Sequence, residues 1–301
     1  MSGITGVTND TYVRLLIRSM RLQQWTKNVF VLSPLLFSLH LFDGHILLRS
    51  LAGFFLFSFL ASAIYILNDI VDAKVDRSHP VKRQRPIASG ALPVSLAVFA
   101  VALIVPITLG LAALIHLDFA LILIGYFVLN VVYSYALKKA VIIDVMTIAA
   151  SFVLRIVAGA VIIDVPISEW LLICTSLLAL FLGFSKRRHE ITVLEADAHI
   201  HRPVLLEYST YFLDQMISLV TASTLICYIL YTVDAETVDK FGSNALLYTT
   251  PFVLYGLFRY YYLVHQRNTG GDPTSEFLSD VPLLIDVFLY AITVIGILYL
   301  R

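Results

Sequence analysis

The chain has 301 residues, of which 59% are hydrophobic and 14% charged, and its mean hydropathy is +0.85. Soluble domains carry about 25% charged residues, so this composition excludes an ordinary soluble domain and predicts an all-α polytopic membrane protein. The formal net charge is zero, which gives no sign of a nucleic-acid partner.

Nine stretches are apolar over about the length that a membrane-spanning helix needs, roughly 20 residues, and none shows the alternation of a β-strand. Ser33, Pro34 and Ser38 interrupt the first stretch, so neighbouring helices would have to cover its backbone. We expect one transmembrane domain over residues 1–301, with 1–27 as a cytoplasmic segment. The expected spans are residues 28–42, 46–67, 93–115, 118–136, 141–163, 168–185, 210–232, 246–265 and 283–300.

The basic residues are distributed unequally between the two sides of these spans. Arg49, Lys240 and Arg301 fall on one side and Arg155 falls inside a span, whereas the other seventeen Lys and Arg residues fall on the side of the N-terminus. Because basic loops stay in the cytoplasm, we expect a cytoplasmic N-terminus and an external C-terminus. The cytoplasmic connections are also the long and charged ones, so function is expected at the cytoplasmic mouth.

A strongly polar stretch, NDIVDAKVDRSHPVKRQRPIASG (residues 68–90), follows the second expected span. Asp69, Asp72 and Asp76 are spaced so that on one helix they fall within a sector about 60° wide. Unpaired, these carboxylates would repel one another, and a divalent cation would remove the conflict. Mg²⁺ prefers one or two carboxylates together with substrate phosphates. We therefore predict Asp69, Asp72 and Asp76 as Mg²⁺ ligands, with Asn68 adding an amide oxygen or holding a water.

The same stretch continues with Lys82, Arg83 and Arg85, between Pro80 and Pro86, which stiffen the loop. Arginine forks suit phosphate oxygens and lysine adds a point charge, so carboxylates, metal and basic side chains together describe a diphosphate site. The alternative is a solvated loop in which acids balance bases that serve only topology. The helical spacing of the aspartates favours the site.

Two more segments place polar side chains on the cytoplasmic side. QQWTKN carries Lys27 and Asn28 just before the first span, and YSYALKK carries Tyr133 and Lys138 at the end of the fourth. Both segments are also typical of the aromatic and lysine anchors of a membrane interface. Beside that interpretation, we take Lys27 and Lys138 as candidate catalytic cations, and Asn28 and Tyr133 as candidate substrate contacts.

Two further basic features remain. Arg155 lies inside the fifth span, where a guanidinium is costly unless it faces the bundle interior and finds a partner. Asp144 is about three helical turns earlier on the same face, so we expect these two to pair, either in support of the site or as a purely structural pair. SKRRHE puts Lys186, Arg187 and Arg188 after the sixth span, which phosphate binding and positive-inside anchoring explain equally well.

With these residues in hand, the sequence resembles the UbiA superfamily of intramembrane prenyltransferases. The pattern N-D-x-x-D-x-x-x-D after the second span, followed by a basic loop, is typical of that family, and its nine-helix bundle agrees with the expected spans. RLQQWTKN, the stretch 68–90, YSYALKK, LRIVAGA and FLGFSKRRHE are similar to one branch, decaprenyl-phosphate phosphoribosyltransferase. The resemblance covers nearly the whole chain.

This resemblance implies a Mg²⁺-dependent enzyme of the bacterial inner membrane, with its active site on the cytoplasmic side. Its partners would be phosphoribosyl diphosphate, polyprenyl phosphate and membrane lipids. The reaction would transfer a 5-phosphoribosyl group to the polyprenyl phosphate and release diphosphate, for the synthesis of a cell-wall arabinan precursor. Intramembrane enzymes of this size often associate, so a homo-oligomer is compatible with the sequence.

One departure from the family bears on the substrate. The ordinary prenyltransferases carry a second Asp-rich motif after the sixth span, where this chain has Lys186, Arg187 and Arg188, with Glu190 beyond. A cationic run suits an anion held directly, namely the ribose 5-phosphate or the lipid phosphate. The alternative enzyme would move a prenyl group from a prenyl diphosphate to an aromatic acceptor. A lipid transporter is a more distant alternative, because few polar residues cross the membrane interior.

Overall fold

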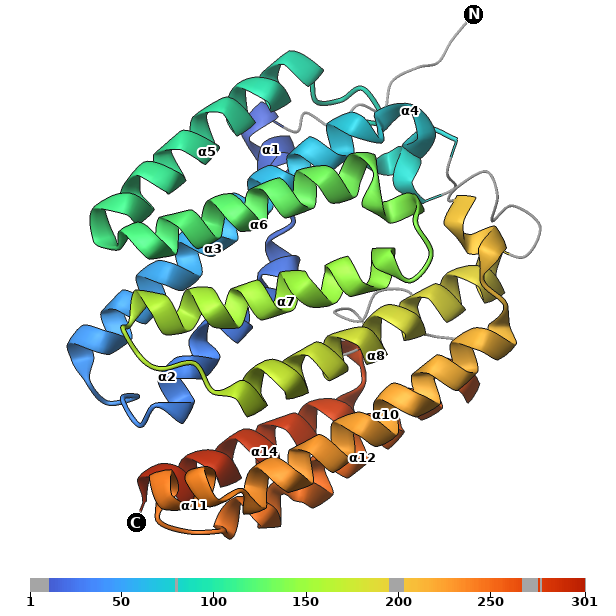
Figure 1. Ribbon diagram of the computed structural model, residues 1–301. Helices are drawn as coiled ribbons and strands as arrows, with labels where there is room; N and C mark the ends of the chain where they lie inside the picture. The colour runs from blue at the N-terminus through green and yellow to red at the C-terminus, as the bar shows by residue number, and fades with distance from the viewer. Residues whose placement is uncertain (1–10, 79–80, 195–202, 267–275, 277, 301) are drawn as a thin grey trace, which may run out of the picture.

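The computed structural model describes residues 11–78, 81–194, 203–266, 276 and 278–300; Pro80 and Arg301 lie outside them. This described part consists of helices and connecting turns without a β-strand, which confirms the all-α expectation (Figure 1). The longer helices are α3 (Gly44–Val71), α5 (Val94–Ile115), α6 (Leu117–Tyr135), α7 (Ile143–Ile162), α8 (Glu169–Leu194), α10 (Thr210–Val233), α12 (Thr250–Gln266) and α14 (Val281–Tyr299). The shorter elements are α1 (Tyr12–Met20), η1 (Leu22–Leu32), α2 (Ser33–Phe37), α4 (Ala73–Asp76), η2 (Lys82–Gln84), η3 (Leu137–Lys139), η4 (Pro203–Glu207), α11 (Ala235–Phe241) and η5 (Ala245–Thr249).

Seven helices of the described chain are long and apolar enough to cross a membrane: α3, α5, α6, α7, α8, α10 and α14. The other two expected spans differ from a continuous long helix. The first is divided between the 3₁₀ helix η1 and the five-residue α2, which has Pro34 in its first turn. The eighth is divided between η5 and the 17-residue α12. The structure therefore supports seven uninterrupted spans where the sequence predicted nine.

Helix η1 owes its unusual form to the elements that surround it. A 3₁₀ run of 11 residues is uncommon, because the hydrogen-bond geometry is poorer than in an α-helix. Its backbone lies so close to α7 that a Cβ at Gly159 would stand 2.0 Å from the Val31 carbonyl oxygen. On the other side, Trp25 Nε1 donates to Ser62 Oγ of α3 at 2.9 Å. Tertiary contacts, rather than its own apolar pattern, thus fix the conformation of this segment.

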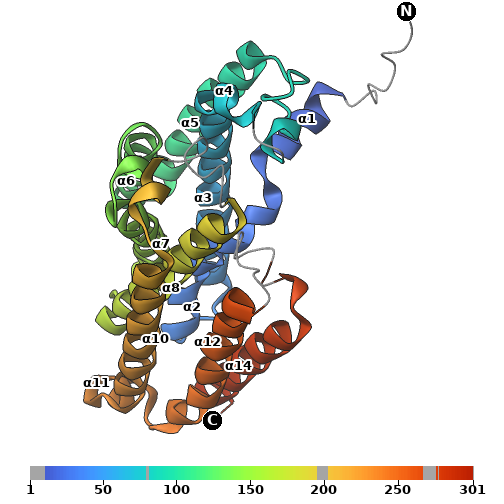
Figure 2. The same ribbon diagram turned by 90° about the vertical axis from the view of Figure 1, so that its right-hand side faces the viewer.

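The long helices form two groups, each with its own core (Figures 1 and 2). Helices α3, α6 and α7 bury an apolar cluster that includes Phe57 and Leu123, and α5 packs beside α3 and α6. Helices α8, α10, α12 and α14 share a second cluster that includes Phe181 and Ile217. Helix α7 contacts both groups, since it packs on α6 and on α8.

The first and last parts of the chain meet at one end of the bundle. Tyr299 of α14 donates its hydroxyl hydrogen to the Leu36 carbonyl at 2.8 Å, and the Leu41 amide N donates to the same hydroxyl oxygen at 3.2 Å. These hydrogen bonds join the N-terminal and C-terminal parts of the chain at this end.

A polar cluster ties three connections together at the same end. Asp164, in the turn between α7 and α8, accepts from Arg49 Nη1 at 2.8 Å and contacts His116 Nε2 at 3.0 Å. Arg49 belongs to the start of α3, and His116 joins α5 to α6. The hydrogen bonds from Arg49 and then His116 hold the pKa of the exposed Asp164 carboxyl below its usual value.

Candidate active site

Two buried carboxylates converge at the C-terminal end of α3. Asp69 and Asp76 are 2% and 3% exposed. Arg85 Nη1 donates to Asp69 Oδ1 at 3.1 Å and to Asp76 Oδ2 at 2.6 Å, so one nitrogen bridges the two acids. Arg21, from the turn after α1, also donates to Asp69. The predicted clustering of acidic and basic side chains is thus present for Asp69, Asp76 and Arg85.

Asp72 takes a different direction because the helix breaks there. Helix α3 ends at Val71, and Asp72 has φ −88° and ψ 0° before α4 begins. Its half-exposed carboxylate accepts from Lys138 Nζ of η3 at 2.7 Å. Among the described residues, no group of three His, Cys, Asp or Glu side chains is placed to hold one metal ion. The expectation that all three aspartates point the same way is therefore wrong for Asp72, and their metal role stays a prediction.

The basic loop is held in place by its own backbone and by Arg77. Arg77 Nε donates to the Ala88 carbonyl at 3.1 Å, and Leu92 N donates to the Pro86 carbonyl at 2.8 Å. Gly90 has φ +81°, a left-handed conformation that glycine adopts without steric cost. These contacts turn residues 82–86 back over the end of α3.

The loop, α3 and the N-terminal helix line an open cavity of about 270 Å³. Of the predicted basic residues, Lys82 and Arg85 line it, whereas the exposed Arg83 does not. Four basic side chains and one carboxylate face the cavity, so its lining favours an anion. The lining residues are Arg18, Arg21, Asp69, Val81, Lys82, Gln84, Arg85 and Pro86.

Arg18 and Arg21, which come from the N-terminal segment, were not predicted as site residues. Arg21 lies 48 residues before its partner Asp69, so no local motif connects the two. The available signal was the spacing of Arg14, Arg18 and Arg21, four and three residues apart, which places them on one side of a helix.

Asn28 and Arg155 meet inside the bundle rather than at the cavity. Asn28 is 1% exposed; its Nδ2 donates to Ser58 Oγ at 3.0 Å and its Oδ1 accepts from Arg155 Nε at 2.9 Å. Arg155 also donates to the Tyr126 hydroxyl at 2.9 Å and to the Ser151 carbonyl at 2.6 Å. Arg155 does face the interior, but the expected pair with Asp144 is wrong, because neutral oxygens take the place of that carboxylate. Lys27, beside Asn28, is half-buried on η1.

Asp144 instead pairs with Arg187 in a second buried polar cluster. Arg187 is 1% exposed, and its Nε donates to Asp144 Oδ2 at 2.7 Å. Arg187 also donates to Glu190 and, from Nη2, to the Tyr133 hydroxyl at 3.4 Å. Tyr208 donates to the other Asp144 oxygen at 2.7 Å. Burial, followed by this hydrogen bond, raises the pKa of Tyr208 well above its usual value. Two carboxylates therefore already neutralise Arg187.

The neighbouring basic residues of α8 are engaged in a similar way. Arg188 Nε donates to Asp214 Oδ1 at 2.6 Å, and His265 Nε2 contacts the same oxygen at 3.0 Å. Lys186 is half-buried and makes contacts of its own. In this structure the predicted cationic run is thus largely an ion-pair network within the protein. Asn68 faces a hydroxyl, since Ser134 Oγ donates to its Oδ1.

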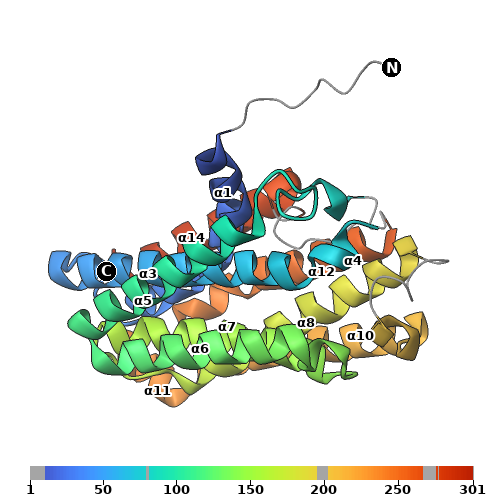
Figure 3. The same ribbon diagram turned by 90° about the horizontal axis from the view of Figure 1, so that it is seen from above.

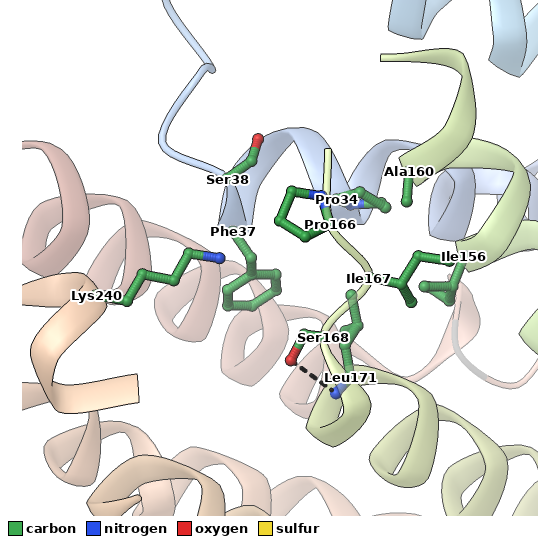
Figure 4. Close-up of a pocket in the computed structure, with 10 residues that line it drawn as sticks. All are labelled: Pro34, Phe37, Ser38, Ile156, Ala160, Pro166, Ile167, Ser168, Leu171 and Lys240. Carbon is green, nitrogen blue, oxygen red and sulfur yellow. Dashed lines mark hydrogen bonds between the residues drawn. The ribbon is translucent and has the colours of Figure 1, made fainter. Parts of the chain in front are cut away.

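A second cavity lies at the other end of α8 (Figure 4). It contains one basic side chain, Lys240, and no carboxylate among the residues that line it, so it lacks the oxygen ligands that a metal-assisted diphosphate site needs. We therefore assign the candidate site to the cavity beside Asp69. The second cavity is lined by Pro34, Phe37, Ser38, Ile156, Ala160, Pro166, Ile167, Ser168, Leu171 and Lys240.

Comparison with known proteins places the chain among intramembrane transferases. The model of the UbiA prenyltransferase family matches residues 30–281. A decaprenyl-phosphate phosphoribosyltransferase of Mycobacterium tuberculosis is 30% identical over 269 residues, which are 88% of this chain and 87% of that protein. One of Corynebacterium glutamicum is 30% identical over 290 residues, which are 95% of this chain and 87% of that protein.

The fold also matches solved structures. A UbiA homologue from Archaeoglobus fulgidus bound to DMAPP and Mg²⁺ aligns with a TM-score of 0.69 and 18% identity, over 95% of this chain and 99% of that one. This likeness concerns the arrangement of helices, which is the one that the sequence resemblance implied. From the family match and the relatives, the chain belongs to the UbiA prenyltransferase family.

Proposed function

We propose that the protein transfers a 5-phosphoribosyl group from phosphoribosyl diphosphate to a polyprenyl phosphate and releases diphosphate. The observation that carries this proposal is the convergence of Asp69 and Asp76 on Arg85, beside a cavity in which Asp69 is the one acidic lining residue among four basic ones. Carboxylates among cations suit a strongly anionic substrate that brings a divalent cation with it. The Mycobacterium tuberculosis and Corynebacterium glutamicum relatives, which match this chain over most of their length, carry the corresponding name. A cell-wall arabinan precursor is the proposed product.

Mg²⁺ is the proposed cofactor. The oxygens of Asp69 and Asp76 surround one position, which an Arg85 nitrogen takes in this structure, and Asp72 lies half-exposed on the next turn. This oxygen donor set fits Mg²⁺, which binds through one or two carboxylates plus substrate phosphates. When bound, Mg²⁺ supplies positive charge that neutralises the diphosphate leaving group. Arg85 would then turn from the carboxylates to the diphosphate.

The chain's own residues act mainly by positioning and by charge. Arg85 and Lys82 hold diphosphate oxygens while the bond between C1 of the ribose and the diphosphate oxygen breaks and its electron pair leaves with diphosphate. An oxygen of the lipid phosphate forms the new bond to C1. That oxygen is already anionic, so the acceptor needs no general base. Placing the two reactants and stabilising the developing charge account for the catalysis.

The 5-phosphate of the donor needs a further cation, because burying it without one is costly. Lys27 and Lys186 are the proposed candidates, and Lys138 is a third that would have to exchange its contact with Asp72 for the phosphate. Arg187 and Arg188 are weaker candidates than the sequence suggested, since carboxylates of the protein already contact both.

The proposed setting is a bacterial inner membrane that the chain crosses nine times, with a cytoplasmic N-terminus and active site. In this arrangement residues 22–37 and 245–266 form the two irregular crossings that complete the seven long helices. The distribution of basic residues supports the orientation. We also propose that copies of the chain associate into a homo-oligomer.

The test is diphosphate release by the purified protein in lipid nanodiscs, supplied with phosphoribosyl diphosphate, a polyprenyl phosphate and Mg²⁺. Asp69→Asn and Asp72→Asn are each expected to lower kcat about a hundredfold or more, because charge stabilisation of the leaving group is lost. Asp118→Asn, at an exposed aspartate of another helix, is the matched control and should keep full activity. Turnover of a prenyl diphosphate with an aromatic acceptor, and none with the proposed pair, would replace this function by prenyl transfer.

A further inference from the structure

The short helix α1 has three distinct sides. It lies crosswise to the long helices (Figure 3). One side is buried: Leu15 and Ser19 are 7% and 1% exposed, and Leu15 packs in a cluster with Ile66 of α3 and Ile87 of the basic loop. This side fixes α1 to the end of α3 and thus beside the candidate site.

The second side is apolar and open. Val13 and Ile17, four residues apart and so on one side of the helix, are 67% and 46% exposed. A helix of nine residues is about 13 Å long and cannot cross a hydrocarbon core about 30 Å thick. Because α1 runs across the spanning helices, it lies along the membrane plane. Its open apolar side is therefore suited to the boundary between headgroups and acyl chains.

The third side faces the cavity beside Asp69 and is basic. Arg18 lines this cavity, together with Arg21 from the turn that follows. Arg21 pairs with Asp69. The Arg18 guanidinium, which is exposed, makes no hydrogen bond or ion pair with any part of the chain that the structure describes. One cation of the cavity is thus left to bind an anion from outside the protein.

We propose that Arg18 binds the phosphate group of the acceptor lipid, whose hydrocarbon chain runs along the open apolar side of α1. This inference rests on the proposed function and adds to it the residue and the surface that receive the acceptor. Arg18 follows Ile17 on the same helix. A lipid whose phosphate contacts Arg18 can therefore place its hydrocarbon chain beside Ile17, in the acyl region of the membrane. A soluble diphosphate has no use for that apolar surface, whereas a lipid phosphate matches both sides of α1 in charge and polarity.

The kinetic test uses the full-length protein in nanodiscs and varies each substrate while the other is saturating. Arg18→Gln is expected to raise KM for polyprenyl phosphate about tenfold or more, with kcat and KM for phosphoribosyl diphosphate unchanged, because one charge-assisted hydrogen bond to the lipid is lost. Arg14→Gln, one turn earlier and outside the cavity lining, is the matched control and should leave both KM values unchanged. A rise in KM for phosphoribosyl diphosphate instead would assign Arg18 to the donor and overturn the proposal, as would no change in either.

A binding measurement separates this inference from the proposed reaction. Native mass spectrometry of the wild type and Arg18→Gln, titrated with a polyprenyl phosphate and with the corresponding polyprenol, requires no turnover. Weaker binding of the phosphate alone in the variant supports the inference, even if the wild type proves inactive with phosphoribosyl diphosphate. Equal binding by both proteins overturns it, even if the proposed reaction takes place.

Discussion

Replacing Arg187 by methionine tests whether the basic run of α8 is a phosphate site or a structural network. Arg187 and Asp144 are 1% and 0% exposed in side-chain terms, and Arg187→Met leaves the Asp144 carboxylate buried with only the Tyr208 hydroxyl to compensate it. Removing one partner of a buried ion pair costs about 3–5 kcal/mol. For a chain of this size that loss lowers Tm on the order of 10 °C.

The double variant Arg187→Met/Asp144→Leu provides the decisive comparison. Because apolar residues that replace both partners of a buried pair are often tolerated, the double variant should recover much of the lost Tm. Arg188→Met, whose partner Asp214 is partly exposed, should lose less than Arg187→Met. Thermal unfolding in detergent and KM for phosphoribosyl diphosphate are measured on the same preparations. A normal Tm with a raised KM for Arg187→Met would refute the structural interpretation and make Arg187 a direct phosphate ligand.

Two further predictions concern stability. Gly159→Ala should destabilise the protein by about 1–3 kcal/mol or more, because its Cβ would stand 2.0 Å from the Val31 carbonyl oxygen. Gly125→Ala, which has no atom within 4 Å of its Cβ, should unfold at or slightly above the wild-type Tm. Equal Tm values for the two variants would disprove the close contact. Asp164→Asn should lower Tm only slightly at pH 7. The pKa of Asp164 is held below its usual value by Arg49, so the contribution of its carboxylate is present above about pH 4 and is lost as pH falls through the lowered pKa. The Tm difference from wild type should therefore shrink as pH falls below about 4, and a difference that grows toward low pH would contradict this assignment.

The parts of the site that are close in sequence could be predicted, and the parts that are distant could not. Asp69, Asp76, Lys82 and Arg85 lie within one short stretch of the sequence, so the spacing of charges was informative. The break at Asp72 carries no proline or glycine, and a continuous helix was the natural expectation. Because of this break, the Asp72 carboxylate points away from Asp69 and Asp76, which was not predicted.

Distant partners depend on which helices become neighbours, and helical periodicity does not determine this. The period correctly placed Asp144 and Arg155 on the inner side of α7. Their partners, however, are Arg187, 43 residues from Asp144, and Asn28, 127 residues from Arg155. Asp144 and Arg155 share one face of α7 but are about three turns apart. Each therefore pairs with a side chain of another element that packs against its own part of the helix.

The packing of η1 on α7 also has a consequence for biosynthesis. The ribosome delivers η1 early, yet its buried amide at Asn28 meets Arg155 only after 127 further residues have been made. Residues 22–37 are too few to cross the bilayer as one regular helix, and every backbone polar group in hydrocarbon must find a partner. The first apolar segment therefore cannot reach its final conformation when it leaves the ribosome. If residues 22–37 cross the membrane as proposed, this segment has to wait at the membrane interface or in the insertion machinery until α7 arrives. The N-terminal crossing would then be completed only after about half of the chain has been made.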